Sequence, residues 1–169
     1  MLKLRSRSVA DTKAIAGGLA RLSRIDDVVL LEGDMGAGKT VFAQGFGEAL
    51  GVDEPITSPT FNLVHTYDTG RIVLHHADLY RLDRTAEVSD LALGELVEGD
   101  GVLLIEWGEA AAEVLVDHLD VRLESVSGGD GEVSEDERSI TVTARGDSWT
   151  RRWPKLETAL QPWLGTARS

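Results

Sequence analysis

The sequence contains no cysteine. Disulfide bonds, thiol catalysis and cysteine-ligated zinc are therefore excluded, although this leaves the redox compartment open. No apolar run approaches the roughly 20 residues that a helix needs to cross a bilayer. Residues 1–6 carry charges and lack the apolar core of a signal peptide. We therefore expect a cytoplasmic protein with no membrane partner.

Positive charge is scarce as well. The 169 residues include 17 Lys and Arg against 29 Asp and Glu, for a formal net charge of −12. Such a surface repels the phosphates of nucleic acid, so we expect the chain to reach RNA only through a basic partner. Most of the charge serves solubility. The length and the 42% hydrophobic content predict one globular domain over residues 1–169.

One stretch organises the chain. Residues 33–40, GDMGAGKT, match the phosphate-loop pattern G-x-x-x-x-G-K-[ST] at every fixed position. The apolar, β-branched run at 28–31 before it predicts a buried strand. Apolar residues after it recur with helical spacing at positions 42, 46, 49 and 50. The pattern thus lies between a strand and a helix, where its chemistry requires it.

Each fixed residue type of this loop has a physical role. Gly33, Gly36 and Gly38 lack Cβ atoms, so the backbone can curl and bring its N–H groups close to a phosphate. The N-terminus of the following helix adds partial positive charge. Lys39 supplies a full charge for the β- and γ-phosphates, and the Thr40 hydroxyl can bind magnesium. The loop therefore predicts a nucleoside triphosphate site, the weaker alternative being a glycine-rich turn that binds nothing.

The rest of the chain predicts alternating strands and helices. We expect a closing helix within 147–164, started or broken near Pro154, and a mobile loop over the glycine-, serine- and acid-rich residues 125–138. The loop at 52–60, with three hydroxyls, is either a sensor of the γ-phosphate or a plain connection. The other expected elements are an edge strand at 1–7, a helix from Ser8 to about 24, hairpins at 61–79 and 119–144, helices at 84–98 and 109–116, and a strand at 102–105.

Two acids each end a predicted strand. Asp78 and Glu106 are candidates for handling magnesium or water, because ligands of open α/β sheets bind at the carboxyl ends of strands. Trp107 follows Glu106 and is either a core residue or a cover for a ligand. We assign His65, His75 and His76 to ordinary packing or surface roles rather than to a metal, because their spacing is not that of a known helical or finger site and adjacent residues of a strand point to opposite faces.

Four segments taken together resemble the TsaE (YjeE) family of bacterial ATPases, which act in making threonylcarbamoyladenosine in tRNA. The three segments beyond the phosphate loop make the resemblance specific, and it is densest over residues 31–109. The segments are 33–40, Thr57-Ser58-Pro59-Thr60-Phe61, His76-Ala77-Asp78-Leu79-Tyr80-Arg81 and Ile105-Glu106-Trp107.

The resemblance implies a fold and a setting. The fold is α/β, a P-loop NTPase-like three-layer sandwich with a mixed, mostly parallel sheet flanked by helices. The cofactors are ATP or ADP and Mg2+, and hydrolysis by the chain alone is slow. The implied partners are proteins of the TsaB and TsaD type, with tRNA reached only indirectly through that complex.

The resemblance also implies roles by matching position. Lys39, Asp78 and Glu106 are the catalytic candidates, and Thr40, Asp78 and Glu106 are the magnesium candidates. The nucleotide-binding candidates are Thr12, Gly33, Asp34, Met35, Gly36, Ala37, Gly38, Lys39, Thr40, Ser58, Thr60, Trp107 and Arg138. Of these, Ser58 and Thr60 belong to a switch loop that responds to the γ-phosphate, and Thr12 and Arg138 border the nucleotide.

Two other functions fit a phosphate loop. A small-molecule kinase needs an acceptor pocket and usually a lid rich in arginine, which the sequence does not show. In a nucleotide-gated binding module, hydrolysis is incidental and the bound state matters. A GTPase is less favoured, because the sequence contains no Asn-Lys-x-Asp motif to read guanine.

Overall fold

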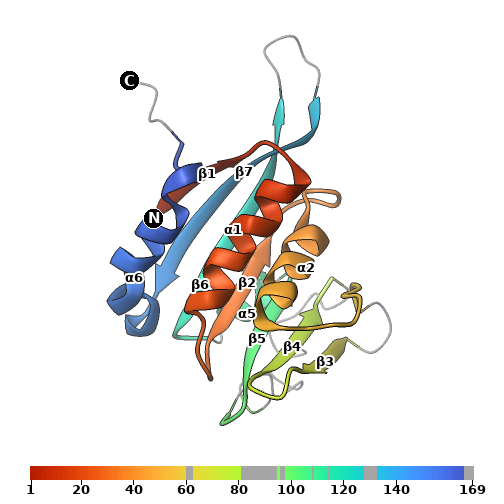
Figure 1. The fold of residues 1–169 in the computed structure, drawn as a ribbon, viewed down its shortest axis with the longest axis vertical. Coiled ribbons are helices and arrows are strands. Elements are labelled where there is room, and N and C mark those ends of the chain that lie inside the picture. The colour runs from red at the N-terminus through yellow and green to blue at the C-terminus, as the bar shows by residue number, and fades with distance from the viewer. Residues whose placement is uncertain are drawn as a thin grey trace.

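The computed structural model describes residues 1–59, 63–80, 95, 98–107, 109–113, 115–127 and 133–165. In this part of the chain, seven strands form one sheet in the order β1-β7-β6-β2-β5-β4-β3 (Figure 1). The strands are β1 (Leu2–Ser6), β2 (Val28–Glu32), β3 (Val64–Asp68), β4 (Val73–Asp78), β5 (Gly101–Glu106), β6 (His118–Ser127) and β7 (Val133–Arg145).

The sheet is mixed, as expected. The neighbours β6–β2, β2–β5 and β5–β4 run parallel. The outer pairs β1–β7, β7–β6 and β3–β4 run antiparallel. The phosphate-loop strand β2 therefore lies inside the parallel part, between β5 and β6. This order brings the carboxyl ends of β2, β4 and β5 to one edge of the sheet.

Helices cover both faces of the sheet. The described helices are α1 (Val9–Leu22), α2 (Lys39–Leu50), α5 (Glu109–Ala112) and α6 (Asp147–Leu160), followed by the 3-10 turn η1 (Gln161–Trp163). The larger core cluster joins α1, α2 and α6 to one face, where Figure 1 shows them in front of the strands. A smaller cluster joins α5 to the other face. Alternate residues of β2 enter the two clusters, so the architecture is the three-layer α/β fold that the sequence predicted.

Local sequence signals set the ends of several elements. Ser8 caps α1, its hydroxyl accepting a hydrogen bond from the backbone N–H of Asp11 at 3.1 Å. Gly51 caps α2 in the left-handed conformation, with φ of 101°. Gly18, the second residue of the Gly17-Gly18 pair in α1, allows α1 and α6 to pack closely. A Cβ at this position would lie 2.9 Å from the side chain of Leu160 in α6. None of the described helices is long and apolar enough to cross a bilayer.

Other expected boundaries differ from the structure. The residues predicted as a mobile loop at 125–138 are partly strand, because β6 continues to Ser127 and β7 begins at Val133. The reason is that backbone hydrogen bonds between two strands can extend a hairpin into water even where few of its side chains are apolar. Pro154 neither starts nor breaks α6 but lies inside it at an exposed position. The helix predicted at 109–116 ends at Ala112, and the one predicted at 84–98 lies almost wholly outside the described residues.

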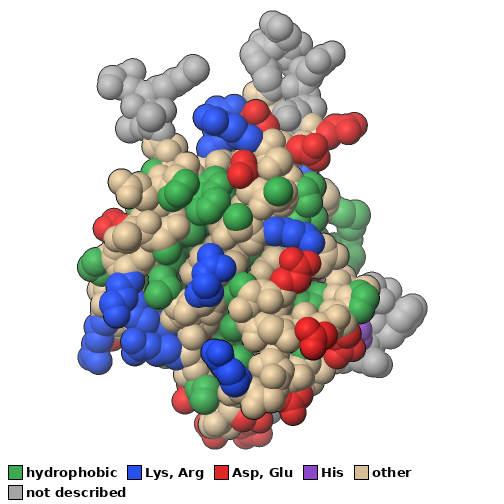
Figure 2. Space-filling view, viewed as in Figure 1, with side chains coloured by type: hydrophobic (Ala, Val, Ile, Leu, Met, Phe, Trp, Pro, Cys, Tyr) green, Lys and Arg blue, Asp and Glu red, His purple; other side chains and the backbone are tan. Residues whose placement is uncertain are grey.

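Charge is distributed unevenly over the surface. On the face drawn in Figure 2, Lys and Arg side chains gather at the lower left, where Figure 1 places α6, and Asp and Glu line the lower edge and the right. Arg151 and Lys155 are exposed one turn apart in α6. Although the chain as a whole is acidic, α6 therefore carries a basic region that includes Arg151 and Lys155.

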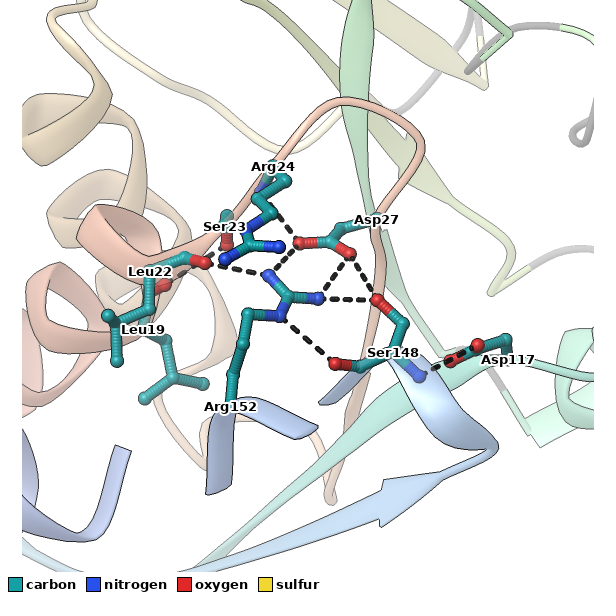
Figure 3. A network of polar contacts seen from close by, with 8 residues as sticks. All are labelled: Leu19, Leu22, Ser23, Arg24, Asp27, Asp117, Ser148 and Arg152. Atoms are coloured by element: carbon teal, nitrogen blue, oxygen red, sulfur yellow. Dashed lines mark hydrogen bonds and ion pairs between the residues drawn. The ribbon is translucent and has the colours of Figure 1, made fainter. Parts of the chain in front are cut away.

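A buried ion pair fixes α6 against the start of β2 (Figure 3). The guanidinium of Arg152 donates to both carboxylate oxygens of Asp27 at 2.6 Å, and these side chains are only 4% and 5% exposed. The same guanidinium donates to the carbonyl of Leu22 at 2.7 Å and to the Ser148 hydroxyl at 2.6 Å. One side chain thus joins the end of α1, the entry to β2 and the first turn of α6.

Replacing Arg152 with methionine should lower the free energy of unfolding by about 3 kcal/mol, because it leaves the Asp27 carboxylate buried without its partner. Urea denaturation followed by circular dichroism measures this. The matched control is Arg151→Met, at an exposed neighbouring position, which should change stability by no more than about 0.5 kcal/mol. Equal effects of the two substitutions would show that the ion pair does not hold α6.

Candidate nucleotide site

A cavity of about 570 Å³ opens where β2, β4 and β5 end. This volume is in the range of small-molecule and cofactor sites. The lining residues come from the phosphate loop and the start of α2, from the loop before β3, from the strand ends and from β7. They are Met35, Gly36, Gly38, Lys39, Thr40, Val41, Ser58, Pro59, Leu63, Asp78, Tyr80, Glu106, Trp107 and Arg138. Most of the residues predicted from the sequence are thus brought together.

The phosphate loop has the glycine geometry that the sequence predicted. Gly33, Gly36 and Gly38 have φ of 141°, 80° and 100°, which only glycine adopts readily. A Cβ on Gly33 would lie 2.3 Å from the carbonyl oxygen of Leu123 in β6, so this position has no room for a side chain. Gly38 directly precedes α2 and has no side chain to cap it. The start of α2 therefore lines the cavity without a side-chain cap, as at an anion site.

Lys39 lies in the wall of this cavity and is only 5% exposed. Its ammonium group donates to the carbonyls of Gly33 and Asp34, the latter at 2.8 Å. It also lies 3.8 Å from the centre of the Trp107 ring, within cation–π range. These partners are neutral, so an anionic ligand is a stronger partner for Lys39 than any of them.

The two predicted acids lie side by side. Asp78 and Glu106 are register partners on the parallel strands β4 and β5, so their side chains leave the same face of the sheet. The Ser58 hydroxyl bridges them, at 2.8 Å from Asp78 Oδ2 and 3.0 Å from Glu106 Oε2. Glu106 is only 2% exposed. A hydroxyl of the predicted switch loop therefore contacts both carboxylates.

A histidine that the sequence analysis assigned to packing also contacts this pair. His76 Nε2 lies 3.2 Å from Glu106 Oε1, and the ring is fully buried. The sequence could have indicated this contact, because His76 and Asp78 are two residues apart in a strand and therefore lie on the same face of the sheet. His75, the residue before it in the strand, faces the opposite side of the sheet. It contacts the Thr66 hydroxyl at 3.2 Å, in the packing role that was expected.

Arg138 and Trp107 complete the walls. Arg138 donates from β7 to the loop carbonyls of Ala37 at 2.8 Å and Gly36 at 3.3 Å. Trp107 has φ of 58°, unusual for a residue with a side chain, and its ring centre lies 4.8 Å from that of Tyr80. Tyr80 also lines the cavity; it was not among the predicted site residues, although it lies in the segment 76–81 that carries the family resemblance.

Five of the predicted nucleotide-binding residues are not among the described residues that line the cavity. Gly33, Asp34 and Ala37 belong to the phosphate loop but line a second pocket. Thr12 is buried outside the lining set, and its hydroxyl lies 2.7 Å from that of Ser6, which is the register partner of Arg138. Thr60 lies outside the described residues. The described residues also hold no group of three or more His, Cys, Asp or Glu side chains arranged for a metal. The magnesium set of Thr40, Asp78 and Glu106 stays a prediction.

Comparisons with known proteins decide the family. The family model described as "Threonylcarbamoyl adenosine biosynthesis protein TsaE" matches residues 6–133. The chain belongs to the TsaE family. It is 42% identical over 148 residues to the tRNA threonylcarbamoyladenosine biosynthesis protein TsaE of Bacillus subtilis, covering 88% of this chain and 89% of the relative. To the protein of the same name from Streptomyces coelicolor it is 40% identical over 135 residues, covering 78% and 88%.

A solved structure agrees with this assignment. The chain is similar to the crystal structure of Bacillus subtilis YdiB, with a TM-score of 0.74 and 36% sequence identity. The match covers 93% of this chain and 94% of YdiB. The likeness in fold therefore covers nearly the whole chain. As a member of the TsaE family, the chain has a role in tRNA threonylcarbamoyladenosine biosynthesis.

Proposed function

We propose that this TsaE-family chain is a magnesium-dependent ATPase. It supports threonylcarbamoyl transfer to the tRNA adenosine next to the anticodon, within a complex of the TsaB-TsaD-TsaE type. One observation carries the proposal. A single cavity contains Lys39 and Thr40 of the phosphate loop together with Ser58 and the two buried or half-buried acids.

The residues of the cavity fit a magnesium–nucleotide complex. The loop, curled by the positive φ of its three glycines, and the start of α2 would hold the phosphates through backbone N–H groups. Lys39 would supply the positive charge that balances them. Magnesium prefers few protein oxygens, supplemented by phosphate and water. Thr40, Asp78 and Glu106 offer such oxygens and would hold the ion, which neutralises phosphate charge when bound.

Hydrolysis would depend on the same side chains. Negative charge on the phosphoryl oxygens in the transition state is stabilised by Lys39 and by the loop amides, which are already oriented. Glu106 is suited to orient the attacking water, because it is buried and its oxygens are held by hydrogen bonds. Asp78 lies beside it, where it is placed to act directly or through water.

The small number of positively charged side chains in the cavity supports the proposal that hydrolysis depends on partner proteins. Among the described residues that line the cavity, the cationic side chains are Lys39 and Arg138, and both donate to loop carbonyls. An arginine supplied by a partner typically accelerates phosphoryl transfer by about 10³–10⁵-fold. Slow hydrolysis by the chain alone, with completion of the site by proteins of the TsaB and TsaD type, fits this arrangement.

Reconstitution tests the proposal. The chain is combined with TsaB- and TsaD-type proteins, tRNA, an activated threonylcarbamoyl donor and ATP, and threonylcarbamoyladenosine is measured by mass spectrometry of the digested tRNA. We expect modification to require both this chain and hydrolysable ATP. Equal modification when the chain is omitted would contradict the proposal, and a phosphorylated small molecule in the mixture would support a kinase instead.

A further inference from the structure

The buried contact between His76 and Glu106 assigns a role to a residue outside the predicted site. We propose that His76 is a positioning residue, whose Nε2–H group holds the Glu106 carboxylate in the orientation that hydrolysis requires. The proposal rests on the proposed ATPase function. It depends on the register of two strands, on the surroundings of the imidazole ring and on the second hydrogen bond that Glu106 accepts.

The register places His76 beneath Glu106 on one face of the sheet. In the parallel pair β4–β5, His76 lies opposite Leu104 and Asp78 lies opposite Glu106. Nε2 is 3.2 Å from Oε1, and the side chains of His76 and Glu106 are 0% and 3% exposed. Water does not compete for this contact, so the strands fix the donor relative to the carboxylate.

The surroundings of the ring decide which nitrogen carries the proton. Nδ1 of His76 is buried and has no hydrogen-bond partner among the described residues. A buried N–H without a partner costs more than a lone pair without one, so a proton on Nε2, where the Glu106 carboxylate accepts it, is favoured over a proton on Nδ1. In this tautomer, Nε2 donates to Oε1 of Glu106.

The other donor to Glu106 is of a different kind. The Ser58 hydroxyl comes from a loop and is within reach of both Asp78 and Glu106. A hydroxyl has one proton, so it donates to only one carboxylate at a time. His76 belongs to a strand paired on both sides. His76 is therefore the donor that keeps Glu106 in place when Ser58 turns to Asp78 or to a ligand.

A matched pair of substitutions separates positioning from packing. The amide nitrogen of glutamine reaches approximately where Nε2 lies, whereas that of asparagine reaches only as far as Nδ1. His76→Gln thus keeps a donor for Glu106, and His76→Asn removes it. His75→Asn is the control, because His75 is buried in the same strand and its contacts are with Thr66 and Asp100.

Steady-state ATP hydrolysis by the full chain is the first readout. Loss of an outer hydrogen-bond partner of a site residue typically costs 10–100-fold, so we expect His76→Asn to lower kcat by about that factor. The KM for magnesium-ATP should change less than kcat, because the loop and Lys39, which would hold the phosphates, are unaltered. His76→Gln should recover most of kcat, and His75→Asn should resemble the unaltered chain. Equal losses in the Gln and Asn variants, or an unchanged kcat in His76→Asn, would overturn the proposal.

A second readout does not depend on activity, and its main observation needs no variant. Nitrogen NMR of the unaltered chain, labelled at histidine, reports the tautomer of His76. We expect an Nε2-protonated ring whose Nε2–H signal moves in the Glu106→Gln variant. An Nδ1-protonated ring would overturn the proposal, because Nε2 would then have no proton to donate. If the unaltered chain hydrolyses no ATP with its partners present, the ATPase proposal fails, while this measurement still decides whether His76 donates to Glu106.

Discussion

Replacing Glu106 with glutamine should lower the turnover of ATP by about 10²–10⁴-fold, the usual contribution of a positioned acid or base. Glutamine keeps the shape of the side chain, and its one carbonyl oxygen can accept from His76 or from Ser58, but not from both in their present positions. It loses the negative charge that orients and activates a water molecule. Binding of ATP should persist, because the phosphates are held by the loop and by Lys39 rather than by this carboxylate.

Two measurements check this expectation. Phosphate release gives the turnover, and calorimetry gives the affinity for ATP. Glu54→Gln is the matched control, because Glu54 is an exposed acid between α2 and β3 and should affect neither quantity. A Glu106→Gln variant that no longer binds ATP would refute the assignment of this residue to water.

Replacing Lys39 with alanine should remove most of the affinity for the triphosphate. The side chain is buried in the cavity wall, and it carries the positive charge of the phosphate loop. Loss of one partner of a buried charge pair costs about 2–5 kcal/mol. This corresponds to roughly a 30- to several-thousand-fold weaker Kd for ATP.

Calorimetry of ATP binding measures this effect, with Lys13→Ala as the matched control. Lys13 lies on α1, paired with Glu48 at 2.8 Å, and is not among the residues lining the cavity. Its substitution should leave the ATP affinity unchanged. Unchanged ATP affinity in Lys39→Ala would defeat the assignment of the loop as a phosphate site.

The local parts of the site could be predicted from the sequence because their causes are local. The positive φ of Gly33, Gly36 and Gly38 follows from the spacing of the motif, and the strand and helix around it follow from hydrophobic periodicity. The ends of β4 and β5 were predictable in the same way, and with them the positions of Asp78 and Glu106.

The contacts that could not be predicted from the sequence depend on pairing between distant segments of the chain. His76 meets Glu106 only because β4 and β5 pair in one register, which no local pattern specifies. Arg152 meets Asp27 across 125 positions of the chain, and Arg138 reaches Ala37 across 101. The length of the β6–β7 hairpin was also missed, because its outer part is held by backbone hydrogen bonds between polar residues. Local propensity therefore predicted the elements, whereas tertiary pairing decided the contacts around the acids.

The central claim is that this site hydrolyses ATP in the service of a partner complex. The most direct test is phosphate release from magnesium-ATP by the purified chain, first alone and then with TsaB-type protein, TsaD-type protein and tRNA from the same organism. We predict slow release by the chain alone and a large rise when the partners are added, a rise that Glu106→Gln abolishes. Turnover that stays the same with and without the partners would contradict the account.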